Sequence, residues 1–191
     1  MPVTSSNDKA SEILNAARVL MMNRGYNGFS FRDVAAEVGI KSASIHYHYP
    51  TKADLAEATA KAYREMFSEV ISSLGGDDAP ERLRAYGSVF VATLRDQNSL
   101  CLGGVLAADT KTLPNQVRSE VEQFFEDQSA WVASVLQEGQ AKGQIRSEVD
   151  PQAFAKTFVS SLEGAMMVSR CIQHPEDLEA AIEQLIKLVQ T

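Results

Sequence analysis

The chain has 191 residues, of which 45% are hydrophobic and 23% charged, and its formal net charge is −7. The apolar share is large enough to form a core, which excludes a wholly disordered chain. The two cysteines make neither a disulfide framework nor a zinc ligand set, and they fit a reducing compartment. The acidic balance argues at first against a nucleic-acid partner.

The charge is divided unevenly along the chain. Residues 1–52 contain six basic and four acidic side chains, which is a net charge of +2, and the remaining residues carry −9. Two of the three histidines, His46 and His48, also lie in the first segment. Such asymmetry indicates separate electrostatic roles for the two parts. The acidity therefore describes the long C-terminal part, and it does not exclude nucleic acid as a partner of the short N-terminal part.

Nearly every segment of the chain has the pattern of a helix, and strand-type alternation is almost absent. Apolar residues in one stripe predict a helix over 11–24, and Gly25 follows where a glycine typically ends a helix. Capping residues, prolines and glycines mark the limits of the other helices. We expect these at about 31–38, 42–48, 51–74, 80–98, 102–109, 114–142, 151–171 and 175–189. The sequence thus predicts an all-α protein with a mobile polar tail over about residues 1–8.

No segment is typical of a membrane protein or of an exported one. No window approaches the ~18 uninterrupted apolar residues that a membrane helix needs. The first ten residues lack the apolar region of a secretory signal. We therefore expect a cytoplasmic protein that has no membrane partner.

Residues 29–55 contain the spacing of a helix-turn-helix. Two short helices that cross steeply need a small residue where they touch, and Ala35 supplies it. Their turn needs a residue that tolerates positive φ, and Gly39 does so. Ile45 is placed to anchor the second helix on the first. This arrangement predicts that the second helix enters the major groove of DNA.

Short motifs surround this turn on both sides. They are Gly25-Tyr26, Phe29-Ser30, Val34-Ala35, Val38-Gly39-Ile40, Ser44-Ile45, Tyr47-His48-Tyr49 and Thr51-Lys52, with Leu55 after them. Over roughly residues 11–56 the chain resembles the TetR family of bacterial one-component transcriptional regulators. The resemblance implies a three-helix DNA-binding domain over residues 1–55, followed by a helical effector-binding and dimerisation domain over residues 56–191. His46 departs from the tyrosine usual in the family, so neighbouring Tyr47 is expected to contact phosphate in its place.

The second short helix and its surroundings carry side chains suited to DNA. Short polar side chains near its start can approach base edges, and tyrosine and histidine offer donors to phosphates. Lys52, in the first turn of the next helix, adds its charge to the backbone N–H groups as a phosphate clamp. The predicted DNA contacts are Arg32, Lys41, Ser42, Ser44, Tyr47, His48, Thr51 and Lys52. Phe31 and Tyr49 are interpreted as packing residues.

The C-terminal part supplies apolar residues for an effector pocket and for a dimer interface. Effector pockets are mostly apolar and concave. The candidates are Phe67, Phe90, Phe124, Phe125, Trp131, Met166 and Met167, with Cys101, and each of them also fits plain core packing. Apolar stripes over 154–166 and 182–189 fit either the four-helix interface that the resemblance implies or a protomer core. We expect a homodimer, because two half-sites need two recognition helices.

Cys101 supports an alternative hypothesis. It stands before a short predicted helix and beside Gly103-Gly104, and a helix N-terminus raises the reactivity of a thiol. The chain could thus be a repressor that senses electrophiles or redox state through Cys101. The other interpretation is that Cys101 is a small buried hydrophobe, and Cys171 is interpreted as structural.

The motifs that carry enzyme chemistry are missing from the sequence. His46 and His48 are two residues apart, which on a helix separates their rings, unlike the i, i+4 pair of a helical zinc site. There is no phosphate loop, no G-x-S-x-G and no H-E-x-x-H. We therefore expect no catalysis, no metal and no cofactor. The sequence indicates a repressor that a small molecule releases from double-stranded operator DNA, with a ligand-independent architectural protein as the remaining alternative.

Overall fold

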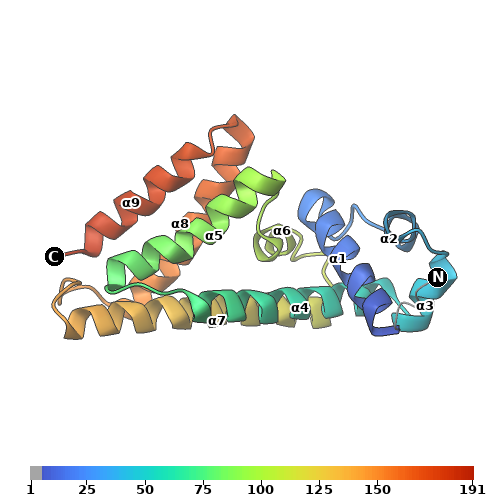
Figure 1. The fold of residues 1–191 in the computed structure, drawn as a ribbon, viewed down its shortest axis with the longest axis horizontal. Coiled ribbons are helices and arrows are strands. Elements are labelled where there is room, and N and C mark those ends of the chain that lie inside the picture. The colour runs from blue at the N-terminus through green and yellow to red at the C-terminus, as the bar shows by residue number, and fades with distance from the viewer. Residues whose placement is uncertain (1–5) are drawn as a thin grey trace. The chain divides into compact units, whose positions relative to one another are not determined.

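The computed structural model describes residues 6–191, and these form nine helices (Figure 1). They are α1 (Ser6–Arg24), α2 (Phe31–Val38), α3 (Ser42–His48), α4 (Lys52–Ser73), α5 (Ala79–Gln97), α6 (Leu102–Ala108), α7 (Asn115–Ala141), α8 (Pro151–Ile172) and α9 (Glu176–Val189). The all-α prediction is confirmed. None of these helices has a stretch both long enough and apolar enough to span a membrane.

The observed helices lie close to the predicted ones, with one larger difference at the start. The bounds of α2 and α3 agree with the prediction, and α1 begins at Ser6 rather than at residue 11. Ser6–Asp8 of the predicted polar tail are therefore helical, and that part of the prediction is wrong. Residues 1–5, which complete the predicted tail, lie outside the described part of the chain.

Side-chain caps fix the starts of α2 and α4, the helices on either side of α3. The N–H of Asp33 donates to the Ser30 hydroxyl at 3.3 Å. At the start of α4 the cap is reciprocal, because the Asp54 N–H donates to Thr51 Oγ1 at 3.1 Å and the Thr51 N–H donates to Asp54 Oδ2 at 2.9 Å. Gly39 ends α2 in the left-handed region, with φ of 70°. These local signals place α3 between two fixed ends.

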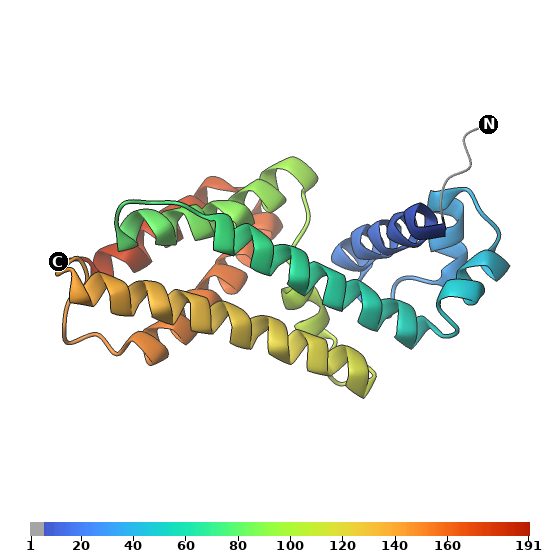
Figure 2. The same cartoon turned by 60° about the horizontal axis from the view of Figure 1, so that its bottom comes forward.

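The described residues form two compact units. The first contains the described residues up to Met66 together with Leu102–Gln123, and the second contains Phe67–Cys101 and Phe124–Thr191. The long helices α4 and α7, which Figure 2 shows along their length, each contribute residues to both units.

The core of the first unit joins α1 to the two helices of the helix-turn-helix. Ile13 and Met21 of α1 are fully buried, as are Val34 of α2 and Ile45 of α3. Leu55 of α4 is also fully buried. Because α3 is only seven residues long, its position depends on this packing rather than on its own helix stability.

In the second unit, α8 and α9 pack against each other and against α5 (Figure 1). A Cβ atom added at Gly87 of α5 would lie 2.7 Å from Ile182 Cδ1 of α9, so the missing side chain permits this close approach. Phe158, Leu162 and Ile186 are fully buried in the same core. The apolar stripes predicted for α8 and α9 therefore line the protomer core.

Candidate DNA-binding surface and effector site

The recognition helix α3 is held on α2 by its inward face. Ile45 has no exposed surface, and Ala35 of α2 is 5% exposed. The ring of His46 packs edge-on against Phe31 with 4.5 Å between centroids, and its Nδ1 lies 3.2 Å from the carbonyl oxygen of Pro50. His46 is nevertheless exposed, and the neighbouring Tyr47 is 84% exposed.

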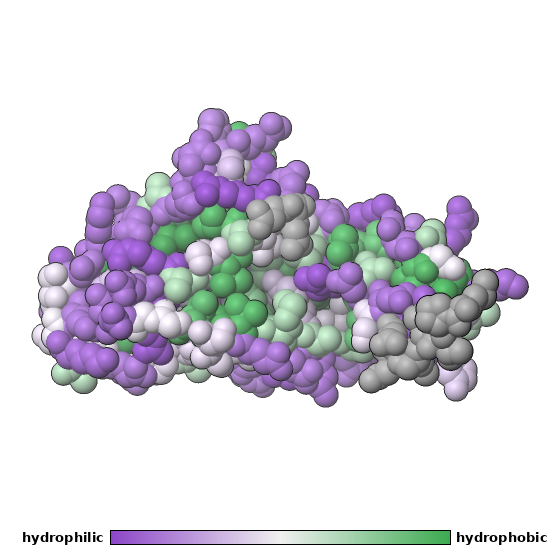
Figure 3. All heavy atoms as spheres, in the orientation of Figure 1, coloured by the Kyte–Doolittle hydropathy of each residue, from purple (hydrophilic) through white to green (hydrophobic). Residues whose placement is uncertain are grey.

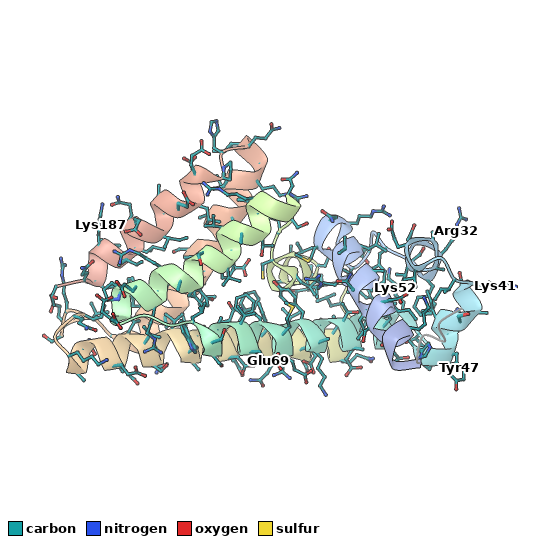
Figure 4. All side chains as sticks on the ribbon, in the orientation of Figure 1. Arg32, Lys41, Tyr47, Lys52, Glu69 and Lys187 are labelled. Atoms are coloured by element: carbon teal, nitrogen blue, oxygen red, sulfur yellow. The ribbon has the colours of Figure 1, made fainter. Side chains whose placement is uncertain are left out.

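The predicted DNA contacts lie on α2, on α3 and in the segments that flank α3, and most of them are exposed. Tyr47 is 84% exposed, the largest exposed fraction among the large apolar and aromatic side chains described. Arg32, Lys41, Ser44 and Thr51 are exposed, whereas Ser42, His48 and Lys52 are half-buried. Figure 4 shows Arg32, Lys41 and Tyr47 in the first unit. An aromatic side chain with so few contacts is available for a partner.

Lys52 has packing contacts besides its predicted phosphate contact. Its Nζ lies 4.7 Å from the ring centroid of Tyr26 and 4.6 Å from that of Phe29. Burial lowers the pKa of Lys52, while the nearby carboxylates of Asp33 and Asp109 act in the opposite direction. The ammonium group therefore stabilises the packing around the end of α1, and its contact with DNA stays a prediction.

The turn after α6 is attached to the turn after α1, which the sequence did not lead us to expect. The N–H of Tyr26 donates to Asp109 Oδ2 at 2.8 Å, and Asn27 Nδ2 donates to Thr112 Oγ1 at 2.8 Å. A Cβ atom added at Gly25 would lie 2.7 Å from the same carboxylate oxygen. Within the first unit, these contacts link the turn after α6 to the turn between α1 and α2.

Most of the predicted effector residues gather in one aromatic cluster of the second unit. The Phe67 ring lies 5.8 Å from that of Phe90 and 5.3 Å from that of Phe124. Trp131 stacks on Tyr86 with 5.5 Å between centroids and 19° between planes. The remaining candidates are distributed as follows: Phe125 contacts Phe124, Met166 and Cys101 are buried, and Met167 is 47% exposed.

A buried polar cluster lies beside the aromatic rings. The Tyr86 hydroxyl donates to Gln128 Oε1, and the Cys101 thiol donates to the carboxyl group of Glu163. Burial raises the pKa of Glu163 to about 7, and its Oε1 is buried without a hydrogen-bond partner. Burial, with Glu163 and Cys101 close by, raises the pKa of Tyr86 well above its usual value. These groups therefore share a site from which water is largely excluded.

Sequence reasoning missed Tyr86, Gln128 and Glu163. A usable signal did exist for Glu163, because it is the one charged residue between Lys156 and Arg170 in an otherwise uncharged stretch of α8. Acidic side chains are rarely buried without a partner. An isolated carboxyl in such a stretch marks a position with a special role.

Glu163 predicts a measurable pH dependence of stability. The pKa of Glu163 is about 7 in the folded protein against an ordinary value of 4.5, so the folded state holds the proton more tightly than the unfolded state does. The stability that this proton provides is fully present below pH 4.5 and is lost as pH rises through 7. The expected loss is at most about 3 kcal/mol in the free energy of unfolding. Denaturant unfolding at pH 5, 6, 7 and 8 should show this loss in the wild type and not in Glu163→Gln. Equal pH dependence in the two proteins would contradict the assignment.

The environment of Cys101 bears on the sensing hypothesis. The residue directly precedes α6, as predicted, but it is only 2% exposed and its thiol donates to a carboxyl group. Reactive thiols are typically exposed and lie near positive charge. The geometry therefore favours a hydrogen-bonding role for Cys101 over a nucleophilic one.

Large apolar side chains are exposed on α8 and α9, together with the charged side chains of Lys156 and Lys187. Met167, Val168 and Ile172 of α8 and Leu188 of α9 are between 47% and 62% exposed. Two acidic side chains of α9 pair with α5, Glu179 with Arg95 and Glu183 with Arg84, each at 2.8 Å. Glu176 and Asp177, at the start of α9, are exposed. Figure 3 shows apolar residues at the surface of this unit, surrounded by polar ones.

Two family models match the chain. Residues 13–59 match the bacterial regulatory proteins of the tetR family, and residues 79–185 match the tetracyclin repressor-like C-terminal domain. The first match contains the whole helix-turn-helix, and the second covers more than half of the chain. The chain belongs to the TetR family of transcriptional regulators, as its N-terminal motifs predicted.

Known relatives agree with this membership over nearly the full length. The chain is 26% identical to the HTH-type transcriptional repressor DhaR of Mycobacterium sp. strain GP1, over 84% of this chain and 81% of that protein. It is 24% identical to the transcriptional regulator AcuR of Cereibacter sphaeroides, over 88% and 79%. The crystal structure of a TetR-family regulator from Agrobacterium tumefaciens superposes with a TM-score of 0.91 at 31% identity, covering 98% of this chain and all of that one.

Proposed function

We propose that this protein is a homodimeric repressor that binds double-stranded operator DNA through residues 1–55 and a small-molecule effector through residues 56–191. The observation that carries the proposal is the exposed outer side of α3, with Tyr47 84% exposed on a helix whose inner side is fixed by buried Ile45. A surface of this kind is a ready partner for the major groove and its phosphates.

The proposed mechanism is a shift between two conformations. One of them places the two recognition helices of a dimer at the spacing of successive major grooves, and the effector favours the other. The hydrogen bond from Tyr26 to Asp109 supports this mechanism, because it ties the DNA-contacting helices to α6. Release from DNA then follows from the difference in effector affinity between the two states.

The proposed dimer interface is the outer side of α8 and α9 that carries Met167, Val168, Ile172 and Leu188. The cores of protein interfaces are depleted in charged residues, and the ion pairs of Glu179 and Glu183 with α5 leave this face without those charges. At Gly164, one helical turn before Val168 on α8, an added Cβ would meet nothing within 4 Å. The bare backbone there would let a second helix approach closely.

We further propose that the protein has no catalytic role and acts in the cytoplasm, where its DNA target lies. Support for a regulatory role comes from the names of its relatives, since DhaR is called a transcriptional repressor and AcuR a transcriptional regulator.

The test is specific binding to the DNA upstream of the protein's own gene. Fluorescence anisotropy at fixed salt should give an affinity for this fragment that is at least about 10³-fold higher than for a shuffled fragment. Affinities within a few-fold of each other would support the ligand-independent architectural alternative and contradict the proposal.

The cationic side chains predict the salt dependence of operator binding. Each phosphate contact that is lost should reduce the slope of log K against log salt by about one. A dimer contains two copies of each lysine, so Lys41→Ala or Lys52→Ala should reduce the slope for DNA binding by the dimer by about two. Either substitution should also weaken binding to all DNA sequences. The measurement is a salt titration of operator affinity with Lys142→Ala, an exposed lysine in the turn after α7, as control. An unchanged slope in Lys52→Ala would show that its contacts with Tyr26 and Phe29 are its whole role.

A further inference from the structure

The carboxyl group of Glu163 is placed as a ligand-binding group would be. Its Oε1 is buried and has no hydrogen-bond partner, while the Cys101 thiol donates to the same carboxyl group. A buried acceptor without a partner costs free energy, so a structure retains one where something else satisfies it. The candidates are an ordered water molecule and a donor group of a ligand.

The charge balance around Glu163 indicates which kind of ligand would gain most. Burial dominates its pKa, the Cys101 hydrogen bond acts against burial, and no described cation contributes. A carboxylate buried without a positive partner is strongly unfavourable, and a ligand that brings the positive charge removes this penalty. The remainder of the chain after residue 52 carries a net charge of −9, which also attracts cations.

The neighbouring rings also suit a cation. Tyr86 lies close enough for Glu163 to raise its pKa, and its ring contacts Trp131, Phe158 and Phe90 with centroid distances between 5.4 and 6.1 Å. The faces of aromatic rings attract cations, and the Arg82 guanidinium already lies 5.5 Å from the Trp131 centroid. Carboxyl and rings together form the pattern of a site for an organic ammonium ion with an apolar body.

We propose that the effector of this protein is an amphipathic organic cation, such as a protonated amine, whose N–H group donates to Glu163 Oε1 while its apolar part packs on the rings around Tyr86. This inference rests on the proposed function, because it names the chemical class of the effector that the second unit binds. It also gives Cys101 a role, since the thiol orients the carboxyl group from its other side.

The test compares the affinities of compounds that share one carbon skeleton and differ in charge. Primary alkyl- and arylalkylammonium ions of three to ten carbon atoms are titrated against the full-length protein at pH 8, beside the alcohols and carboxylates of the same skeletons. Binding is read from the fluorescence of Trp131, the single tryptophan of the chain, which stacks on Tyr86. The best ammonium ion should bind at least about tenfold more tightly than its alcohol and its carboxylate.

Substitution of Glu163 separates a ligand site from a buried water. Glu163→Gln keeps the shape of the side chain and removes its charge. It should lower the affinity for the best ammonium ion about tenfold or more, and the affinity for the matching alcohol should stay the same. The matched control Glu148→Gln, at an exposed glutamate, should change neither. The proposal would be overturned if no ammonium ion bound, or if the ammonium ion and its alcohol bound with equal affinity. It would also be overturned if Glu163→Gln bound the ammonium ion as tightly as the wild type does.

The pH dependence gives a readout that needs no substitution of Glu163. Because the carboxylate must be ionised to pair with the ligand, ammonium affinity should rise between pH 6 and pH 8. Tyr86 and Cys101 are the titratable groups that face Glu163 in the described structure. The rise should persist in Cys101→Ser and Tyr86→Phe, and a flat profile in the wild type would contradict the proposal.

Failure of this inference is distinguishable from failure of the proposed function. Operator binding is measured in the same samples without any compound, so a protein that binds no specific DNA contradicts the proposed function whatever the fluorescence shows. Release of operator DNA by an alcohol or a carboxylate, and not by the ammonium ions, would support the repressor and overturn the cationic effector.

Discussion

Tyr47→Ala should lower operator affinity by roughly 10²–10³-fold without changing the stability of the protein. Interface tyrosines that act as hot spots contribute about 2 kcal/mol each, and a dimer on a palindrome uses two copies. The side chain is 84% exposed, so its removal leaves no void in the core. Anisotropy on the operator fragment gives the affinity, and thermal unfolding gives the stability.

Two further variants show which property of the Tyr47 side chain causes the loss of affinity. Tyr47→Phe separates the hydroxyl, which would donate to phosphate, from the ring. Met66→Ala, at a position on α4 that is 40% exposed, is the control for loss of an exposed side chain. Operator affinity within threefold of wild type in Tyr47→Ala would contradict the placement of α3 against DNA.

Val168→Glu should convert the dimer into monomers and abolish operator binding with it. Val168 is 58% exposed on α8, within the proposed interface. In a symmetric interface the substitution buries two carboxylates, one from each protomer, at a cost of several kcal/mol per ion. The dimer dissociation constant should therefore rise at least roughly a thousandfold, as measured by sedimentation or by light scattering after size-exclusion chromatography.

A second valine provides the matched control for the dimer experiment. Val19 of α1 is 42% exposed and lies outside the proposed interface. Val19→Glu should keep the wild-type mass in solution. A Val168→Glu protein that stays dimeric would place the interface elsewhere.

The helices that could be predicted from sequence are those with local signals at their ends. Ser30 and Gly39 mark the two ends of α2, and the pair Thr51 and Asp54 marks the start of α4. These signals act over three to five residues, and the observed caps match them. The start of α1 was predicted too late, because Ser6–Ala10 carry no apolar stripe that marks them as helical.

Residues whose roles depend on distant partners could not be predicted in this way. The contact of Asp109 with Tyr26 spans 83 positions of sequence, and nothing local at Asp109 indicates it. From sequence alone, the apolar stripes on α8 and α9 fitted a dimer interface and a protomer core equally well. The burial of Phe158, Leu162 and Ile186 within one protomer assigns these stripes to the protomer core. Periodicity reveals that a helix has an apolar face, and the packing partner of that face is a property of the fold.

The site residues also differ in whether local sequence signals or distant partners determine their roles. The exposed DNA-contact candidates could be proposed because the helix-turn-helix is a short-range motif with a known outer side. The aromatic cluster could be named only as a set of apolar residues, and the buried carboxyl of Glu163 beside it was missed. A buried polar group is recognised by its surroundings, which come from four separate segments of the chain.

Footprinting of the upstream DNA is the most direct measurement of what α3 does. The wild type should protect two short half-sites whose centres are about one helical turn, ~34 Å, or a multiple of it apart, as two recognition helices of one dimer require. Tyr47→Ala should lose both half-sites together at the same protein concentration. Continuous protection without half-sites, or equal protection by Tyr47→Ala, would contradict a repressor that reads its operator through α3.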